Sequence, residues 1–260
     1  MDYGINGKRA LITGGSHGIG LCCALALADE GCDIAICSRT KDRIKNAVTQ
    51  IRKKGTEVIG IEADVLSVPD IENVMKTVKE KWGGADILIN NVGGGGRWGD
   101  EDVLKTKEQV WTDVYGKNAL AAVRFTMLAL PHMKSNKWGR VVTISSVYGR
   151  EGGGRPWYNM AKSAEISLMK SLSLDKDLVR KGITFNSIAS GTLMIPDTGW
   201  DEERKKDPEA FKKLCNCQFP MGRPGTPEEI GSVVAFICSV KASLLNGASI
   251  PVDGSEGRSY

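Results

Sequence analysis

Short apolar runs alternate along the chain with longer segments whose apolar residues recur every three or four positions. A strand buried on both faces of a parallel sheet is apolar throughout, whereas a helix that covers the sheet is apolar along one stripe. The strand-like runs are 10–13, 33–37, 57–61, 86–90, 141–144, 183–188 and 249–252. The pattern therefore predicts seven strands separated by helices.

Helices are expected in the intervals between these runs. The helical segments are 19–28, 44–51, 67–82, 107–133, a helix that carries residue 158 and a helix from residue 227. The last helix opens with a capping box from Thr226 to Glu229 and has Pro227 at its first position. This alternation predicts an α/β fold: a doubly wound parallel seven-stranded sheet of Rossmann type, in a single domain over residues 1–260.

In such sheets, ligands bind outside the carboxyl ends of the strands. The loops that follow the first, fourth, fifth and sixth strands should therefore form one functional rim. These loops carry the Gly14 loop, residues 90–96, Ser145 with Ser146, and Ser190 with Gly191.

The segment 192–219 differs from the other connections. It contains Pro196, Pro208 and the charge run DEERKKD, and its one helical pattern spans 208–214. Loops of this length are usually functional lids or disordered segments. We expect a lid that covers the substrate, and a passive insertion is the alternative.

Composition argues against nucleic-acid binding and against a membrane protein. The 260 residues are 41% hydrophobic and 25% charged, and the net charge of +4 is too mild to indicate a nucleic-acid partner. No segment approaches the roughly 20 apolar residues that span a bilayer, and the first residues lack the apolar core of a signal peptide. We expect a soluble cytoplasmic protein without a membrane partner.

The cysteines indicate a reducing compartment. There are seven, an odd number, with no CxxC pair, and four of them lie in apolar segments of the first 37 residues. Cys215 and Cys217 could bind a metal, but no companion ligands stand near them and the chain has only two histidines. The sequence therefore predicts reduced cysteines and no metal site.

Tyr158 and Lys162 stand four residues apart, so a helix places both side chains on nearly the same face. A free phenol has a pKa near ~10 and exchanges protons poorly at neutral pH, but a nearby cation favours its phenolate and lowers that pKa. The pair can therefore exchange a proton with an alcohol or carbonyl oxygen. Taken alone, this spacing more often marks an ordinary surface pair, so its meaning depends on the other motifs.

A glycine-rich loop, TGGSHGIG over residues 13–20, joins the first strand to the first helix. Glycines there let the backbone approach a pyrophosphate, whose charge the helix N-terminus favours. The spacing of Gly14, Gly18 and Gly20 is not G-x-G-x-x-G, and a simple tight turn is the alternative. The position between a strand and a helix favours cofactor binding.

These motifs occur together in one order: TGxxxGxG, Asp64-Val65, the NNVG run 90–93, Asn118, Ser146 and the Tyr158-x-x-x-Lys162 pair. In this order and spacing the chain resembles the short-chain dehydrogenase/reductase family over residues 7–254. Within that family, the ITGGSHGIG, MGRPGTPEEIG and VDGS segments look most like bacterial 3-oxoacyl-(acyl-carrier-protein) reductases and their relatives. The resemblance implies an oxidoreductase.

The family's catalytic roles carry over to four residues. The resemblance implies that Tyr158 donates the proton in reduction and accepts it in oxidation, and that Lys162 favours the phenolate and holds the nicotinamide ribose. It implies that Ser146 hydrogen-bonds the substrate oxygen, with Ser145 as the competitor. Asn118 would form a water-holding kink behind Lys162, and a surface asparagine is the alternative.

The resemblance also implies a set of cofactor-binding residues. Asp64 would accept from the adenine amino group and Val65 would pack on the adenine ring, with a turn-forming aspartate as the alternative. The whole set is Gly14, Ser16, His17, Gly18, Ile19, Gly20, Ser38, Arg39, Asp64, Val65, Asn91, Gly93, Tyr158, Lys162, Gly191 and Thr192.

Three positions depart from the family pattern. Val92 replaces the commoner alanine, Ser190 replaces a proline, and Ile195 stands where a threonine usually reaches the cofactor phosphate. Thr192 or Thr198 is expected to substitute there. None of the departures touches the proton-transfer residues.

The end of the second strand, CSRTK, predicts NADP(H) as the cofactor. An acidic residue there would bind the 2′-hydroxyl of NAD and repel the extra phosphate of NADP, whereas an arginine does the opposite. This chain has Ser38, Arg39 and Lys41, with no carboxylate before Asp42. His17 could add a donor, or it could be a solvent-exposed loop residue.

The substrate class is left open by the sequence. The chemistry fits a carbonyl compound or secondary alcohol: a 3-oxoacyl thioester, a sugar, a steroid, a cyclic ketone or a quinone-like compound. Arginines and tryptophans are expected on the rim loops at Arg97, Arg150, Arg155, Trp98, Trp157 and Trp200. Lys137 and Lys181 resemble positions at which acyl-carrier reductases dock their acidic carrier.

Two further interpretations concern assembly and turnover. The helices that carry Asn118 and follow Tyr158 are apolar on more than one face, and the resemblance implies a homotetramer built by pairing them. A dinucleotide-binding regulator without turnover is the remaining alternative, and the complete set of four catalytic residues argues against it.

Overall fold

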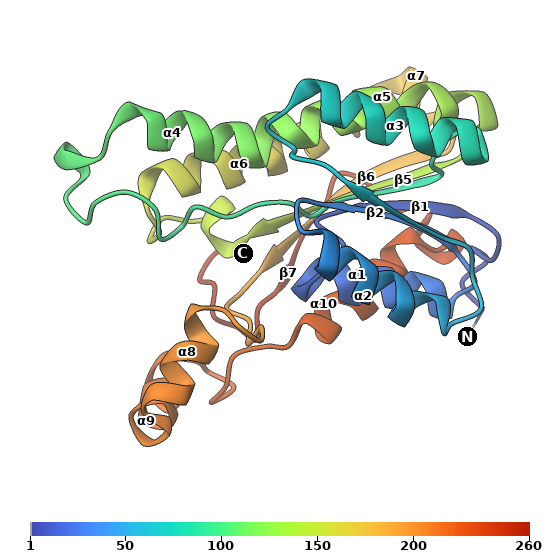
Figure 1. Ribbon diagram of the computed structural model, residues 1–260. Coiled ribbons are helices and arrows are strands. Elements are labelled where there is room, and N and C mark those ends of the chain that lie inside the picture. Colours follow the sequence, from blue (N-terminus) through green and yellow to red (C-terminus); the bar gives the residue numbers. More distant parts are fainter. Residues whose placement is uncertain (1) are drawn as a thin grey trace.

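A seven-stranded parallel sheet forms the centre of the molecule (Figure 1). The computed structural model describes residues 2–260, so the first residue of the expected 1–260 domain lies outside the described residues. The sheet order is β3-β2-β1-β4-β5-β6-β7. The strands are β1 Arg9–Thr13, β2 Asp33–Ser38, β3 Val58–Glu62, β4 Ile87–Asn90, β5 Gly139–Ser146, β6 Ile183–Ser190 and β7 Ser249–Val252. All seven expected strands are thereby confirmed.

Helices cover both faces of this sheet. They are α1 Gly18–Asp29, α2 Lys41–Arg52, α3 Val68–Trp82, α4 Glu108–Tyr115, α5 Ala121–Asn136, α6 Pro156–Leu172, α7 Lys176–Val179, α8 Gly199–Lys206, α9 Pro208–Gln218 and α10 Pro227–Cys238. Helices α1, α2 and α10 lie on one face, and α3, α5 and α6 on the other (Figure 1). The doubly wound α/β fold is thereby confirmed.

Each face of the sheet has its own apolar core. In β1, Ile12 packs into the core on the side of α1 and α10, whereas Leu11 packs into the core on the side of α3 and α5. Both side chains are completely buried. Successive residues of a strand point to opposite faces, so burial on both faces requires an apolar run without alternation, as the sequence has.

The expected helix 107–133 is interrupted in the middle. Helix α4 ends at Tyr115, a π-helical turn spans Gly116–Leu120, and α5 continues from Ala121. Asn118 lies in this turn, where its Nδ2 donates to the carbonyl oxygen of Val114 at 2.7 Å. Asparagine side chains compete in this way for backbone groups, which is why the residue is a poor former of regular helix. The single helix expected here is therefore two helices, α4 and α5, joined by a π-helical turn.

The segment 192–219 contains two helices where the sequence predicted one. Helix α9 includes the expected 208–214, but the preceding charge run also forms a helix, α8. In α8, the Asp201 carboxylate accepts from Arg204 and from Lys205, both at 2.7 Å. Pairs at this spacing stabilise a helix. The two helices project from the body of the molecule (Figure 1).

Candidate active site

Two cavities open at the carboxyl ends of the strands. The larger has a volume of about 480 Å³ and is lined by Ser146, Tyr158 and residues of the 192–219 segment. The smaller, about 310 Å³, is lined by the glycine loop, Arg39 and Asp64. Trp98 lines both cavities, so they adjoin. The rim that the sequence predicted is therefore the place where the candidate residues gather.

Tyr158 and Lys162 lie on the first turns of α6, which starts with a proline at its first position. The Lys162 Nζ lies 5.8 Å from the centre of the Tyr158 ring. Lys162 is buried, and its Nζ donates to the carbonyl oxygen of Ile144 at 2.9 Å and to the Glu165 carboxylate at 3.0 Å. Burial alone would lower the pKa of Lys162, but the charges of Glu165 and Tyr158 outweigh burial and raise it. The tyrosine therefore stands beside a persistent cation.

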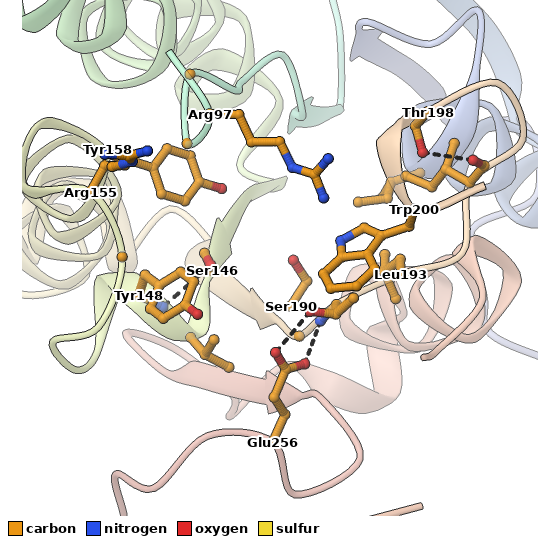
Figure 2. Close-up of a pocket in the computed structure, with 18 of the residues that line it drawn as sticks. Arg97, Ser146, Tyr148, Arg155, Tyr158, Ser190, Leu193, Thr198, Trp200 and Glu256 are labelled. Atoms are coloured by element: carbon orange, nitrogen blue, oxygen red, sulfur yellow. Dashed lines mark hydrogen bonds between the residues drawn. The ribbon is translucent and has the colours of Figure 1, made fainter. Parts of the chain in front are cut away.

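Ser145 and Ser146 end strand β5 and point to opposite sides of the sheet. Ser146 lines the larger cavity, where its Oγ accepts from the Tyr148 backbone N–H at 3.3 Å (Figure 2). The Ser146 hydroxyl hydrogen can therefore be donated to a ligand. Ser145 is buried behind the strand, and its Oγ donates to the Lys162 carbonyl oxygen at 2.9 Å. The geometry favours Ser146 over its competitor as a substrate contact.

Asn118 is completely buried and ties the π-helical turn to the loop after β4. Its side chain donates to the carbonyl oxygen of Gly94 at 2.9 Å and accepts from the Gly94 N–H at 3.1 Å. A Cβ added at Gly93 would lie 2.7 Å from the Asn118 Oδ1 and 2.8 Å from the Lys162 Nζ. Gly93, Asn118 and Lys162 therefore converge at one point, and the surface alternative for Asn118 is wrong.

The glycine loop forms a close turn between β1 and α1. Gly14 and Gly18 have φ values of +66° and +54°, a region that favours glycine. A Cβ at Gly20 would lie 2.4 Å from the Gly14 carbonyl oxygen, so only glycine fits there. The side chain of Asn91 donates to the Thr13 carbonyl oxygen at 2.8 Å and so braces the loop against β4. The loop leaves the first backbone N–H groups of α1 without helical partners, as a pyrophosphate site requires.

The smaller cavity is positively charged on one side. Arg39 lines it together with Arg43 and Lys117. Burial and the charge of Arg39 lower the pKa of Lys117. Asp64 and the buried Val65 line the same cavity. Three cations suit a phosphate on the ribose of an adenine nucleotide, so these residues fit NADP(H).

Sequence reasoning missed Arg43 and Lys117. Arg43 lies in the first turn of α2, shortly after Arg39, and a second arginine so close to the end of β2 was the available signal. No sequence signal marks Lys117, because it lines the cavity from the π-helical turn, which the sequence did not predict.

The threonines expected to replace the missing cofactor contact already form hydrogen bonds within the protein. The N–H and the hydroxyl of Thr192 donate to the Glu256 carboxylate at 2.5 and 2.8 Å, and the Thr198 hydroxyl donates to the Ile195 carbonyl oxygen at 2.7 Å (Figure 2). His17 lines the smaller cavity, and its Nε2 lies 2.9 Å from the Pro196 carbonyl oxygen. Glu256, near the end of the chain, was missed because no motif marks it.

Only some of the expected rim side chains line the larger cavity. Arg97 points into it, with its guanidinium 5.3 Å from the centre of the Trp200 ring and 3.4 Å from Glu203 of α8 (Figure 2). Trp157 is instead completely buried in α6, and its Nε1 donates to the Gly95 carbonyl oxygen at 3.2 Å. Arg150 donates to Ser259 near the end of the chain.

Lys137 and Lys181 lie far from this rim. They immediately precede β5 and β6, at the amino ends of strands whose carboxyl ends carry Ser146 and Ser190. A carrier docked on these lysines would meet the opposite edge of the sheet. The structure therefore gives no support to carrier docking at these positions.

Residues 2–260 contain no helix long and apolar enough to cross a membrane. Over the same residues, no group of three or more histidine, cysteine or acidic side chains could hold a metal ion. All seven cysteines are free, and Cys23, Cys32, Cys37, Cys215 and Cys238 are buried.

Comparisons with known proteins give one consistent result. A family model described as Enoyl-(Acyl carrier protein) reductase matches residues 14–255. The 3-oxoacyl-[acyl-carrier-protein] reductase of Staphylococcus aureus is 33% identical over 251 residues, which are 95% of this chain and 97% of that protein.

Two solved structures extend the comparison. L-sorbose reductase from Gluconobacter frateurii, complexed with NADPH and L-sorbose, is 29% identical, with a TM-score of 0.91 and 100% of both chains covered. An actinorhodin polyketide ketoreductase with NADPH is 30% identical, with a TM-score of 0.88, 97% of this chain and 98% of that chain covered. The three proteins compared above are each named as reductases.

Proposed function

This chain belongs to the short-chain dehydrogenase/reductase family, and on that premise we propose that it is an NADP(H)-dependent oxidoreductase that interconverts a carbonyl compound and a secondary alcohol. The observation that carries the proposal is one cavity lined by Ser146 and Tyr158, with the buried Lys162 Nζ 5.8 Å from the Tyr158 ring centre, beside a second cavity lined by cations.

The protein's own residues supply binding and proton transfer. When bound, NADPH supplies the hydride. Ser146 donates a hydrogen bond to the substrate carbonyl oxygen, where negative charge develops during reduction. The phenol of Tyr158 then gives its proton to that oxygen, and the Lys162 ammonium stabilises the phenolate that remains. Oxidation of the alcohol reverses these steps. Asn118 holds the loop that carries Gly93 against Lys162.

The proposed cofactor contacts divide between the two cavities. The glycine loop, with Ser16, His17 and Ile19, faces the pyrophosphate. Arg39 grips the extra phosphate with Arg43 and Lys117, while Ser38, Asp64 and Val65 hold the adenosine end. Lys162 binds the nicotinamide ribose. Gly191 and Thr192 line the larger cavity on the nicotinamide side.

For the substrate we propose a 3-oxoacyl thioester, and a ketose sugar is the second candidate. The first rests on the similarity to 3-oxoacyl reductases. The second is favoured by the polar lining of the larger cavity, where Arg97 and Glu256 could bind hydroxyl groups and Trp200 could pack on a sugar ring. The EC class proposed is 1.1.1, and segment 192–219 is the proposed lid.

The test is NADPH oxidation, followed by absorbance, with four carbonyl compounds: acetoacetyl-CoA, L-sorbose, a cyclic diketone and a ketosteroid. Turnover of acetoacetyl-CoA above the others supports the first candidate, and turnover of L-sorbose above the others supports the second. Tight NADPH binding with no turnover of any compound would instead indicate a regulator.

The remaining proposals concern assembly and location. Leu120, directly before α5, and Met127 and Leu128, in the middle of α5, are partly exposed. Met160 is partly exposed on α6, as expected if these helices pair in a homotetramer. The free cysteines favour a cytoplasmic location. Residues 1–260 are proposed to form one domain.

A further inference from the structure

A buried carboxylate lies directly beside the proposed catalytic lysine. Glu165 follows Lys162 by three residues on α6, and its Oε2 and Oε1 lie 3.0 and 3.3 Å from the Lys162 Nζ. Exposed fractions of the two residues are 1% for Glu165 and 3% for Lys162. Glu165 is not among the residues proposed for catalysis.

Stability does not explain this pair. Taking two charges out of water costs several kcal/mol per ion, and replacing a buried ion pair by apolar residues is often neutral or stabilising. The fold would therefore tolerate an apolar pair at these two positions. Lys162 has a chemical reason to be a buried cation, because it faces Tyr158, whereas Glu165 has contacts mainly with Lys162.

The groups that face this pair from neighbouring elements are mostly neutral. Strand β5 contributes the Ile144 carbonyl and the Ser145 hydroxyl, and the π-helical turn contributes the Asn118 amide. The charged or titratable neighbours are Tyr158 on α6 and Lys117 on the π-helical turn. Burial and the charge of Lys162 lower the pKa of Lys117. Lys162 is the ionisable group whose charge acts most on Glu165.

We propose that Glu165 is a positioning residue for the reaction: its carboxylate is the buried counterion of the Lys162 ammonium, and it weakens the electric field that Lys162 exerts on the Tyr158 phenol. This inference rests on the proposed function, since it concerns the same proton transfer. It adds a fifth residue, which acts through Lys162 and touches neither substrate nor cofactor.

Burial and the charge of Lys162 act in opposite directions on the pKa of Glu165. Burial raises the pKa of Glu165 to about 7, against the opposing charge of Lys162. Above that pH the carboxylate cancels the ammonium, and below it Lys162 stands as an unbalanced cation beside Tyr158. In a variant without the carboxylate, no buried anion opposes the Lys162 charge as long as Lys162 stays protonated. The Tyr158 phenol of this variant should therefore lose the proton at lower pH, and carbonyl reduction should fall off at lower pH.

The experiment compares the wild type with Glu165→Gln, which preserves shape, and Glu165→Leu, which also removes polarity. Carbonyl reduction by NADPH is measured across the pH range, and kcat and KM are separated. We expect the alkaline fall-off of kcat to move down by about one pH unit in both variants, as expected for removal of one charge within a few ångströms of the phenol. The expected pH shift arises from the loss of the carboxylate charge, so Glu165→Gln and Glu165→Leu should show the same shift.

Ser163→Ala is the matched control. It removes the hydrogen bond that the Ser163 hydroxyl donates to the Gly149 carbonyl oxygen, in the same turn of α6, without touching Lys162 or Glu165. A disturbance of packing should therefore lower kcat in this variant and leave the pH of the fall-off where it is in the wild type.

A second readout needs no turnover. Tyrosinate absorbance is titrated in each protein, with the same protein carrying Tyr158→Phe as the blank, so the difference reports the Tyr158 phenolate. Active wild type with superimposable fall-offs in all variants would overturn the role of Glu165. A shift to higher pH would also overturn it, because Lys162 would then need Glu165 simply to stay charged. Wild type inactive on every carbonyl would instead contradict the proposed function.

Discussion

The hydroxyl of Ser145 donates a hydrogen bond to the backbone carbonyl of Lys162 at 2.9 Å. This contact holds the first turns of α6 against the end of β5, and it occupies the hydroxyl hydrogen of Ser145. Ser146 keeps its hydrogen and faces the larger cavity. We therefore propose different tasks for these adjacent serines: support of α6 for Ser145 and a substrate contact for Ser146.

Substitution of these serines should separate the two tasks. Ser146→Ala should lower kcat by about 100- to 1,000-fold, the usual effect of losing one donor to a developing oxyanion. Ser145→Ala loses one buried hydrogen bond, worth about 1 kcal/mol, and should lower kcat by about tenfold at most. Steady-state kinetics of both variants decide the matter, and the reverse ranking would assign the substrate contact to Ser145.

Arg39→Ala should weaken NADPH binding selectively. A hydrogen bond to a charged phosphate contributes roughly 1.5 to 3 kcal/mol, which corresponds to about 10- to 150-fold in Kd. NADH lacks that phosphate, so its Kd should hardly change. Calorimetric titration of both cofactors measures this, with Arg52→Ala, at the other end of α2, as the control.

Equal losses for NADPH and NADH in Arg39→Ala would mean that Arg39 only packs on the adenine. Ser38→Asp should reverse the cofactor preference, because the new carboxylate would accept from the ribose hydroxyl and repel the extra phosphate. A wild type that prefers NADH would contradict the choice of cofactor.

Trp200→Ala should impair substrate binding while leaving cofactor binding intact. Trp200 lines the larger cavity, lies under the Arg97 guanidinium and packs edge-on against Phe211 and Phe219 at 6.3 and 6.1 Å between ring centres. Its loss should raise KM for the carbonyl compound by roughly tenfold, with NADPH Kd unchanged. Lys213→Ala, on the outer part of α9, serves as the control. An unchanged KM would contradict a lid role for the segment.

The assembly can be tested directly. Light scattering at micromolar concentration should give four times the mass of one 28.1 kDa chain. Replacing Met127 and Leu128 by Glu together should reduce the mass, because each carboxylate would be buried at the helix pairing. A monomeric wild type would refute the tetramer.

The sheet and the glycine loop were predictable because their signals are local. An unbroken apolar run such as 10–13 requires burial on both faces, and Gly14 and Gly20 are required by backbone conformation and close approach. The spacing of Tyr158 and Lys162 is likewise a property of one helix. Each of these signals is contained within a few residues.

Other features depend on contacts that the sequence does not display. Trp157 looked like a rim residue, but Gly95, which lies 62 positions earlier in the chain, accepts its indole N–H and holds it in the core. Lys117 lines the smaller cavity from the π-helical turn between α4 and α5, where the sequence predicted continuous helix. Glu165 reads as an ordinary polar residue of α6 until the packing of β5 against that helix buries it.

Tyr158→Phe is the sharpest test of proton transfer by Tyr158, because the variant keeps the ring and loses the one proton that is transferred. The measurement is kcat for NADPH-dependent reduction of the best carbonyl substrate, with NADPH Kd determined on the same preparation. We predict that kcat falls by about 1,000-fold or more while the NADPH Kd stays unchanged. Activity within about tenfold of the wild type would contradict it.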